Sequence, residues 1–293
     1  MRQHQLHENK KFIIIIDQHK NCQSGKKALI MGTKEKIIGT AIENGASVAG
    51  IASMQALKLS SSHLIYTKMD NYEGVGTVRD KDTLSEKQLF EWPDSAKSLL
   101  VIGLSHPERQ PELDWWDGRG TPGNRLLIDI IKRTSQQIEN NLKMKTRKLH
   151  YYVEKGGVFL KDAAVLAGLG CIGKNNMLVT QSYGPRIRLR ALFLDAELEP
   201  TGPVAFDPCA GCKVYCRRAC PENAMNKKVP LFESINTSLD LPARDGAYNR
   251  EICNIRMEKD VSESGKRIAG EQSPIKYCRK CEFICPIGKK RET

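Results

Sequence analysis

The chain has 293 residues, of which 40% are hydrophobic and 27% are charged, and its formal net charge is +12. These values are ordinary for a soluble globular protein, and the length suits about two domains with a real apolar core. The apolar run from Phe12 to Ile16 is too short for a membrane span or for the core of a signal peptide. We therefore expect a cytoplasmic protein that has no membrane partner.

Residues 1–30 are predicted to form a weakly ordered leader, because they are polar and charged around that one short apolar run. Organised hydrophobic patterning begins only after Met31. Cys22 lies within this leader and is interpreted as an incidental thiol.

A body of alternating helix and strand signals is predicted at 31–203. Apolar residues at helical spacing indicate helices, and short or alternating apolar runs indicate strands. In chain order, the first predicted elements are a helix from Thr33 to a stop at Gly45 and strands at 48–52 and 99–104. A long helix follows after Pro122-Gly123, and its apolar side carries Leu126, Leu127, Ile130, Ile131, Ile138 and Leu142. The last elements are a strand at 150–153, a helix at 158–168 and a strand at 186–194.

The segment Thr201–Pro208 contains two prolines and a glycine and is interpreted as a linker, so we place a domain boundary near residue 203. Regular periodicity is weak in the second domain, residues 204–293. This weakness is expected where metal clusters, rather than a large apolar core, supply much of the ordering energy.

Seven of the ten cysteines fall into two strings that each end in Cys-Pro. Thiolates at i, i+3 and i+7 on a tight loop can bind one [4Fe–4S] cube, and the sulfur of a following Cys-Pro faces a different cube, as in two-cluster ferredoxins. We therefore predict two clusters. The first set is Cys209, Cys212, Cys216 and Cys285; the second set is Cys220, Cys253, Cys278 and Cys281. Three residues rather than two separate Cys212 from Cys216, which changes the local turn.

Zinc, disulfides and haem are less favoured interpretations of the cysteines. A zinc ribbon on Cys209/Cys212 and Cys278/Cys281 would leave four neighbouring cysteines idle. Disulfides would need an oxidising compartment, and the Cys-x-x-Cys-His string typical of attached haem does not occur.

The densest glycine region of the body is 167–176, Ala-Gly-Leu-Gly-Cys-Ile-Gly-Lys-Asn-Asn, and Tyr183-Gly-Pro-Arg186 follows it. Glycines at 168, 170 and 173 would let the backbone approach a flat or bulky ligand, although tight helix-to-strand turns also use glycine. Together, this glycine stretch, the Tyr-Gly-Pro-Arg-x-Arg-Leu strand and the two Cys-Pro strings resemble epoxyqueuosine reductase. More distantly, they resemble the C-terminal half of cobalamin-dependent reductive dehalogenases.

The resemblance implies an α+β protein, in which a nitroreductase-like α/β body binds cobalamin and precedes a ferredoxin-like domain with two [4Fe–4S] clusters. It implies that the following residues bind the cofactor: Gly168, Gly170, Cys171, Gly173, Lys174, Asn175, Met177, Gly184 and Arg186. Cys171 replaces a bulky residue of the family beside the corrin; we favour a packing thiol there, and the alternative is that it approaches the cofactor.

The resemblance also implies a general acid toward the substrate's oxygen, and Glu154 stands at the matching position. The family uses an aspartate there, so the carboxyl group of Glu154 reaches about one methylene further. The residues Lys155-Gly156-Gly157 replace the family's small hydroxyl residue, Gly and Pro. A surface glutamate that merely aligns is the alternative interpretation.

We therefore expect a reductase that passes electrons from two clusters to a corrin cobalt and reduces an epoxide or another substrate with a leaving group. The alternative is a two-cluster ferredoxin-type electron carrier without corrin that docks on a partner enzyme; an RNA-binding module stabilised by clusters is a third. The expected partner is a low-potential electron donor such as ferredoxin or flavodoxin. tRNA is less favoured, because the chain ends soon after Cys285, where longer family members carry a helical-repeat extension that helps to grip tRNA.

Overall fold

The computed structural model describes residues 32–66, 92–150, 153, 157–226, 244–264 and 273–289. The chain divides into two compact units, Met1–Met31 and Gly32–Thr293. The first unit, with the predicted leader and Cys22, lies outside the described residues. The domain boundary near residue 203 stays a prediction.

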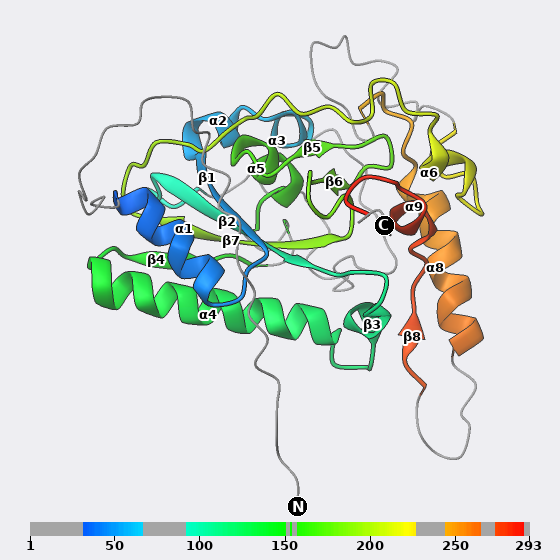
Figure 1. Ribbon diagram of the computed structural model, residues 1–293, viewed down its shortest axis with the longest axis horizontal. Helices are drawn as coiled ribbons and strands as arrows, with labels where there is room; N and C mark the ends of the chain where they lie inside the picture. The colour runs from blue at the N-terminus through cyan, green and yellow to red at the C-terminus, as the bar shows by residue number, and fades with distance from the viewer. Residues whose placement is uncertain are drawn as a thin grey trace, which may run out of the picture. The chain divides into compact units, whose positions relative to one another are not determined.

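A four-stranded antiparallel sheet lies at the centre of the body (Figure 1). Its order is β1 (Val48–Ser53), β2 (Ser98–Ser105), β7 (Ile187–Leu194) and β4 (Thr146–Lys148). In the register of its central strands, Ile51 lies opposite Leu100, and Val101 lies opposite Ala191. The strands predicted at 48–52, 99–104 and 186–194 are confirmed.

The strand predicted at 150–153 is not found at its described residues, and Tyr151 and Tyr152 lie outside the described residues. Strand β4 instead occupies Thr146–Lys148 and pairs with β7, whereas His150 and Val153 are not in a strand. The helix before β4 ends at Leu142 and is followed by Lys143 in the left-handed conformation. The chain therefore turns and reaches β7 earlier than the apolar pattern indicates.

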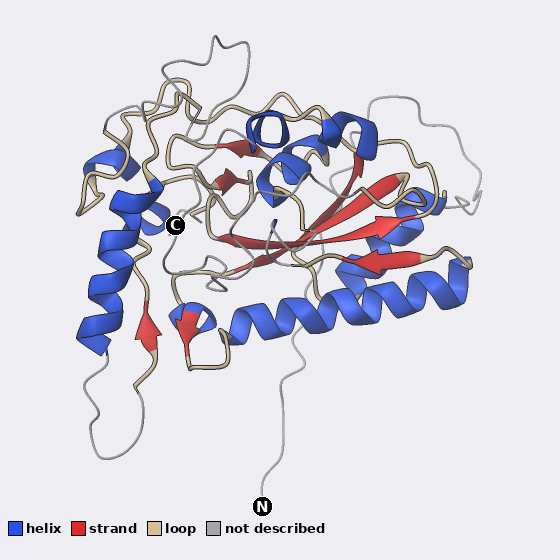
Figure 2. Ribbon diagram, turned by 180° about the vertical axis from the view of Figure 1, so that it is seen from behind, coloured by secondary structure: helices blue, strands red, loops and turns tan. Residues whose placement is uncertain are grey.

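Helices cover both faces of the sheet (Figures 1 and 2). The helices are α1 (Thr33–Glu43) and α4 (Pro122–Leu142) on one face, and α2 (Met54–Lys58) and α5 (Leu160–Leu166) on the other, with α3 (Ser61–Ile65) beside α2. Because neighbouring residues of a strand point to opposite faces, Leu100 packs with α1 and α4 and Leu99 packs with α2 and α5. The sheet is therefore buried on both sides.

The long helix α4 follows its predicted pattern with one exception. The Thr121 hydroxyl caps its start by accepting the Asn124 amide at 3.2 Å. Leu127 and Ile130 are buried as predicted, but Leu126 is 49% exposed. One residue step turns a helix by about 100°, so Leu126 lies at the edge of the apolar side and faces solvent.

The C-terminal segment is made of short elements and one longer helix. These elements are α6 (Tyr215–Arg218), α8 (Arg250–Ser264), β8 (Ile275–Lys276) and α9 (Lys280–Phe283). Strand β8 pairs with β3 (Trp115–Trp116), which follows the 3-10 helix η3 (Pro111–Asp114). In the body, β5 (Cys171–Ile172) and β6 (Leu178–Val179) form a small hairpin.

Helix α8 was not predicted, because its buried side chains, Asn254 and Asp260, are polar and form no apolar stripe. The mixed helix-and-sheet architecture confirms the α+β class. The ferredoxin-like character of the C-terminal segment stays a proposal. None of the described helices combines the length and the apolar character that a membrane span requires.

Candidate functional site

The cysteines of the first predicted set line one cavity of about 330 Å³. Cys209 and Cys212 follow the linker, Cys216 lies on α6, and Cys285 comes shortly after α9. Burial raises the pKa of the Cys216 thiol to about 11, and negative charge on Cys209, Cys285 and Cys212 adds to this effect. The fold therefore brings together four thiols from both cysteine strings.

The second predicted set gathers around helices α8 and α9. Burial raises the pKa of Cys278, and negative charge on Asp260, Cys253 and Cys220 raises it further. The pKa of Cys281 lies well above its ordinary value, first because of burial and then because of Glu282, Cys253 and Cys278. Cys253 thus acts on both Cys278 and Cys281, Cys220 acts on Cys278, and Cys216 of the first set also acts on Cys281.

Each set has the chemistry to hold a [4Fe–4S] cube, which takes one thiolate for each iron. Because burial raises the thiol pKa values, binding of iron has to displace protons. The pairs required by a zinc ribbon, Cys209/Cys212 and Cys278/Cys281, lie in different sets. Within the described ranges, no group of three or more His, Cys, Asp or Glu side chains could hold a single metal ion. Cluster ligation by the two sets stays a prediction.

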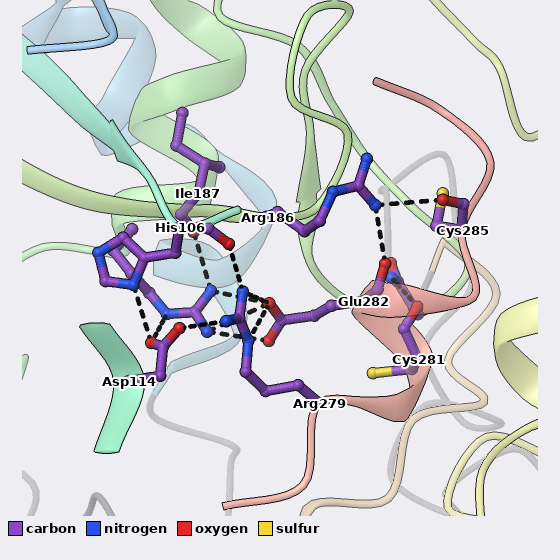
Figure 3. Close-up of polar contacts among 10 residues, drawn as sticks. His106, Asp114, Arg186, Ile187, Arg279, Cys281, Glu282 and Cys285 are labelled. Carbon is purple, nitrogen blue, oxygen red and sulfur yellow. Dashed lines mark hydrogen bonds and ion pairs between the residues drawn. The ribbon is translucent and has the colours of Figure 1, made fainter. Parts of the chain in front are cut away.

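A buried ion-pair network joins the second cysteine string to the body (Figure 3). Arg279 pairs with Asp114 at 2.5 Å and with Glu282 at 2.8 Å, and it donates to the carbonyl oxygen of His106 at 2.9 Å. Arg188 of β7 pairs with the same two carboxylates, each at 3.0 Å. Two guanidinium groups thus balance two carboxylates, as buried charges require.

Asp114 is the member of this network that comes from η3 in the body. Its carboxylate lies 2.9 Å from Nδ1 of His106, which is fully buried. Burial alone would raise the pKa of Asp114, but the hydrogen bond with His106 and the charges of Arg188 and Arg279 hold it below its ordinary value. The carboxylate is therefore ionised at neutral pH.

Arg186 lies just before β7 and is only 5% exposed. Its Nη1 donates to the carbonyl oxygens of Glu282 at 3.0 Å and Cys285 at 3.1 Å, and its Nη2 donates to that of Ile287. Burial lowers the pKa of Arg186, while the nearby Cys285 favours its charged form. The guanidinium therefore holds the turn that carries Cys285 (Figure 3), and its predicted contact with a corrin stays a prediction.

The predicted cofactor segment of the body lies against the first cysteine set. A Cβ atom at Gly173 would be 3.6 Å from Sγ of Cys209. Arg217 donates to the Lys174 carbonyl oxygen at 3.1 Å, and the Asn175 side chain donates to the Cys281 carbonyl oxygen at 3.4 Å. Because Lys174 and Asn175 also line the 330 Å³ cavity, the glycine segment and the first set share one site.

Close packing within the chain accounts for the other glycines of this segment. Gly168 has φ +70°, and a Cβ there would lie 2.6 Å from the Thr201 carbonyl oxygen. A Cβ at Gly170 would lie 2.1 Å from the Val179 carbonyl oxygen, and one at Gly184 2.0 Å from that of Ile287. Such contacts exclude a side chain whether or not a ligand is bound.

Two of the remaining predicted residues lie in or beside the hairpin of β5 and β6. Met177 donates its amide to Oδ1 of Asn175 at 3.2 Å. Cys171 lies on β5, where burial raises its pKa to about 11 and negative charge on Cys209 adds to the shift. Glu154 lies outside the described residues, so its role as an acid stays a prediction.

Sequence reasoning missed the ion-pair network. Arg279 and Glu282 lie inside the second cysteine string at i and i+3, and charged residues at that spacing between cysteines were a usable signal. Nothing local in the sequence indicates that Asp114 and His106 meet them, because these contacts cross more than half of the chain.

The sequence is similar to curated proteins of two kinds, although no protein-family model matches it. It is 41% identical over 202 residues to the tetrachloroethene reductive dehalogenase of Dehalobacter restrictus, covering 66% of this chain and 33% of that protein. It is 24% identical over 272 residues to the epoxyqueuosine reductase of Bacillus subtilis, covering 82% of this chain and 66% of that protein. The chain thus spans about a third of the length of the first and about two thirds of the second.

Solved structures of both kinds share the fold. The epoxyqueuosine reductase from Streptococcus thermophilus matches with a TM-score of 0.58 and 21% identity, over 88% of this chain and 66% of that one. A reductive dehalogenase also matches over most of this chain. In sequence and in fold, the chain is therefore an epoxyqueuosine reductase-like and reductive dehalogenase-like protein.

Proposed function

We propose that the chain is an iron–sulfur oxidoreductase with two [4Fe–4S] clusters, one on each cysteine set. The observation that supports this proposal most directly is the cavity lined by all four thiols of the first set, and the charges of Cys220 and Cys253 that act on Cys278 support the second. Cys285 and its neighbour Cys281 belong to different groups, as the crossover of two-cluster ferredoxins requires. We assign the 330 Å³ cavity to the first cluster, because its four thiols line that space.

We further propose that the enzyme is a cobalamin-dependent reductase. One similar solved structure is that of a reductive dehalogenase, which suggests a mechanism for B12-dependent dehalogenation; it matches with a TM-score of 0.56 and 16% identity. The glycine segment lies beside the proposed first cluster, because Lys174 and Asn175 line the cavity that its thiols share, so a corrin bound on the body next to this segment would be close to that cluster. The bound corrin would supply a cobalt centre that accepts electrons one at a time.

Glu154 is the proposed proton donor to the departing oxygen of the substrate. If it has this role, Glu154→Gln lowers turnover by about 100-fold or more, whereas Glu154→Asp retains part of the activity. Equal activity of the Gln variant and the unsubstituted enzyme would leave Glu154 as an ordinary surface residue. The substrate is proposed as a class only: an epoxide or another compound with a leaving group.

The proposed electron source is a low-potential donor such as ferredoxin or flavodoxin. A tRNA partner is supported by one similar structure, an epoxyqueuosine reductase with a modified tRNA stem loop, at a TM-score of 0.56 and 19% identity. Binding of such a stem loop to this chain should fall steeply with added salt if basic side chains carry it. Weak binding without salt dependence would remove tRNA from the proposal.

Anaerobic purification and reconstitution with iron, sulfide and cobalamin test the proposed function. We expect about eight irons per chain, retention of corrin and a cob(II)alamin spectrum. Cys253→Ser should disrupt the second cluster, whereas Cys171→Ser, at a cysteine outside both sets, should keep all eight irons. A protein that contains mainly zinc, or full iron content in Cys253→Ser, contradicts the cluster assignment.

One observation favours a second candidate, a two-cluster electron carrier without corrin. Gly168, Gly170 and Gly184 are explained by contacts within the chain, so they do not by themselves require a flat ligand. This candidate predicts eight irons, no retained corrin and a stable complex with a partner enzyme. Cobalt analysis of the reconstituted protein decides between the two candidates.

A further inference from the structure

The first thiol set has a buried cation beside it. Arg186 is 5% exposed, and its three hydrogen bonds all go to main-chain carbonyl oxygens of the string that ends at Cys285 and of the turn after it. Among the described residues it is in none of the ion pairs, although Glu108 and Glu282 lie near enough to favour its charge. Its positive charge therefore lies beside Cys285, to whose carbonyl oxygen it donates at 3.1 Å.

The second thiol set has carboxylates beside it instead. Oδ2 of Asp260, a residue only 7% exposed, accepts the Cys278 amide at 2.7 Å. Glu282, 5% exposed, follows Cys281 directly in the chain. Both carboxylates also have arginine partners, Arg256 for Asp260 and the ion-pair network of Figure 3 for Glu282. In the first set, Asp207 likewise accepts the Cys209 amide at 3.0 Å, but its side chain is 41% exposed and pairs with Arg244, so solvent and that arginine screen it. The two sets therefore differ in their buried charges: Arg186 lies beside the first, and Asp260 contacts the second.

A positive charge beside a cluster favours its reduced form, and a negative charge favours its oxidised form. Buried charges act strongly, because the interior screens them less than water and salt do. We propose that Arg186 and Asp260 set the order of the two reduction potentials, so that the first cluster is the easier one to reduce. An electron shared by the two clusters is then held mainly at the first, beside Gly173 and Lys174 of the body.

This inference rests on the proposed function only through the presence of the two clusters; it requires neither corrin nor a particular substrate. Arg186 and Asp260 are positioning residues here, because each acts on a cluster through its charge and not on a substrate. The readout is therefore a reduction potential and not turnover.

The test is an anaerobic redox titration of the reconstituted full chain, followed by EPR. Cys216→Ser and Cys278→Ser identify which signal belongs to the first and to the second cluster. Arg186→Gln should lower the ratio of reduced to oxidised first cluster about tenfold at fixed potential, about 59 mV for one electron. Arg186→Lys, which keeps the charge, should leave that ratio within about a factor of three of the original.

Asp260→Asn is the reciprocal variant, because its amide oxygen can still accept the Cys278 amide. It should raise the ratio of reduced to oxidised second cluster and leave the first unchanged. Arg190→Gln is the matched control, since Arg190 lies on the same strand β7 and donates to Asn124 at 2.7 Å. It should move neither potential. If Arg186→Gln does not fold, Asp260→Asn decides the question.

Iron analysis separates the two kinds of failure. Fewer than about eight irons in the unsubstituted chain overturns the proposed clusters, and the inference with them. Eight irons with the second cluster easier to reduce, or with potentials that do not respond to Arg186→Gln or Asp260→Asn, overturns the inference alone.

Discussion

The body and the C-terminal segment hold their structures by different means. In the body, side chains such as Leu100, Ile102 and Leu192 are fully buried between the sheet and helices α1 and α4. In the described residues beyond position 204, the buried apolar side chains are only Ala224, Met225 and Ala247. The C-terminal segment is held mainly by ion pairs and main-chain hydrogen bonds, and by metal if the proposed clusters bind. One chain thus combines a body that is stabilised by apolar burial with a C-terminal segment whose structure would be completed by bound clusters.

Removal of iron should separate these regions most clearly. A chelator applied to the reconstituted protein is expected to abolish hydrogen-exchange protection in α8 and α9, because metal binding supplies much of their folding free energy. Protection in β2 and β7 should persist, since apolar burial holds those strands. If both regions lose protection together, or if α8 stays protected without iron, the two regions are not stabilised by different means.

Substitution of Glu282 should have the next largest effect. Glu282→Gln leaves the buried Arg279 and the half-buried Arg188 without one of their two carboxylates and should cost about 3–5 kcal/mol of unfolding free energy. Arg125→Gln breaks the exposed pair with Asp117 and should leave the unfolding free energy almost unchanged, because water screens that pair. Urea unfolding measures both changes, and equal costs would contradict the role of the network.

Two adjacent leucines of α4 test the apolar basis of the body. Leu127→Ala removes a side chain that is 1% exposed and should cost about 2–5 kcal/mol. Leu126→Ala removes one that is 49% exposed and should change the stability by about 0.5 kcal/mol or less. Similar losses at both positions would mean that α4 does not pack on the sheet as described.

Protonation of His63 should have a smaller, pH-dependent effect on the free energy of unfolding of the body. It packs between the rings of Trp92 and Phe159, with centroids at 5.1 and 5.0 Å. Burial lowers its pKa from 6.5 to about 4, partly opposed by Asp162. Its contribution to stability is therefore full above pH 6.5 and is lost as the pH falls toward 4, by about 1.4 kcal/mol per pH unit.

Denaturant unfolding between pH 7 and pH 5 measures this slope. The variant His63→Phe, which keeps a ring but cannot take up a proton, should show a flatter profile over that range. An unchanged profile would mean that His63 does not govern the acid response. Asp114, with a lowered pKa, contributes only at still lower pH.

Prediction from the sequence succeeded where the signal is local. The apolar runs of β2 and β7 and the helical spacing of α4 predict those elements closely. The spacing of cysteines also predicts groups that the fold brings together. Helix α8 escaped prediction because its buried residues are polar, and Cys253 could be placed only by counting the remaining ligands.

Contacts between distant parts of the chain had no such signal. The pairing of Trp115 with Lys276 in β3 and β8 joins two-residue strands, which are too short for any alternating pattern. The three hydrogen bonds that Arg186 donates to main-chain carbonyl oxygens depend on how the turn at Cys285 folds. Every residue has such a carbonyl oxygen, so residue types alone do not indicate these contacts. The sequence therefore indicates which thiols gather but not the charges that surround them.

The division of ligands between two strings has a consequence for biosynthesis. The first set needs Cys285, which the ribosome adds long after Cys209, and the second needs Cys278 and Cys281 from the same late string. Neither proposed cube can be completed on a nascent chain that has not yet exposed this string. If the proposed clusters form, their assembly can therefore finish only after translation has passed this string.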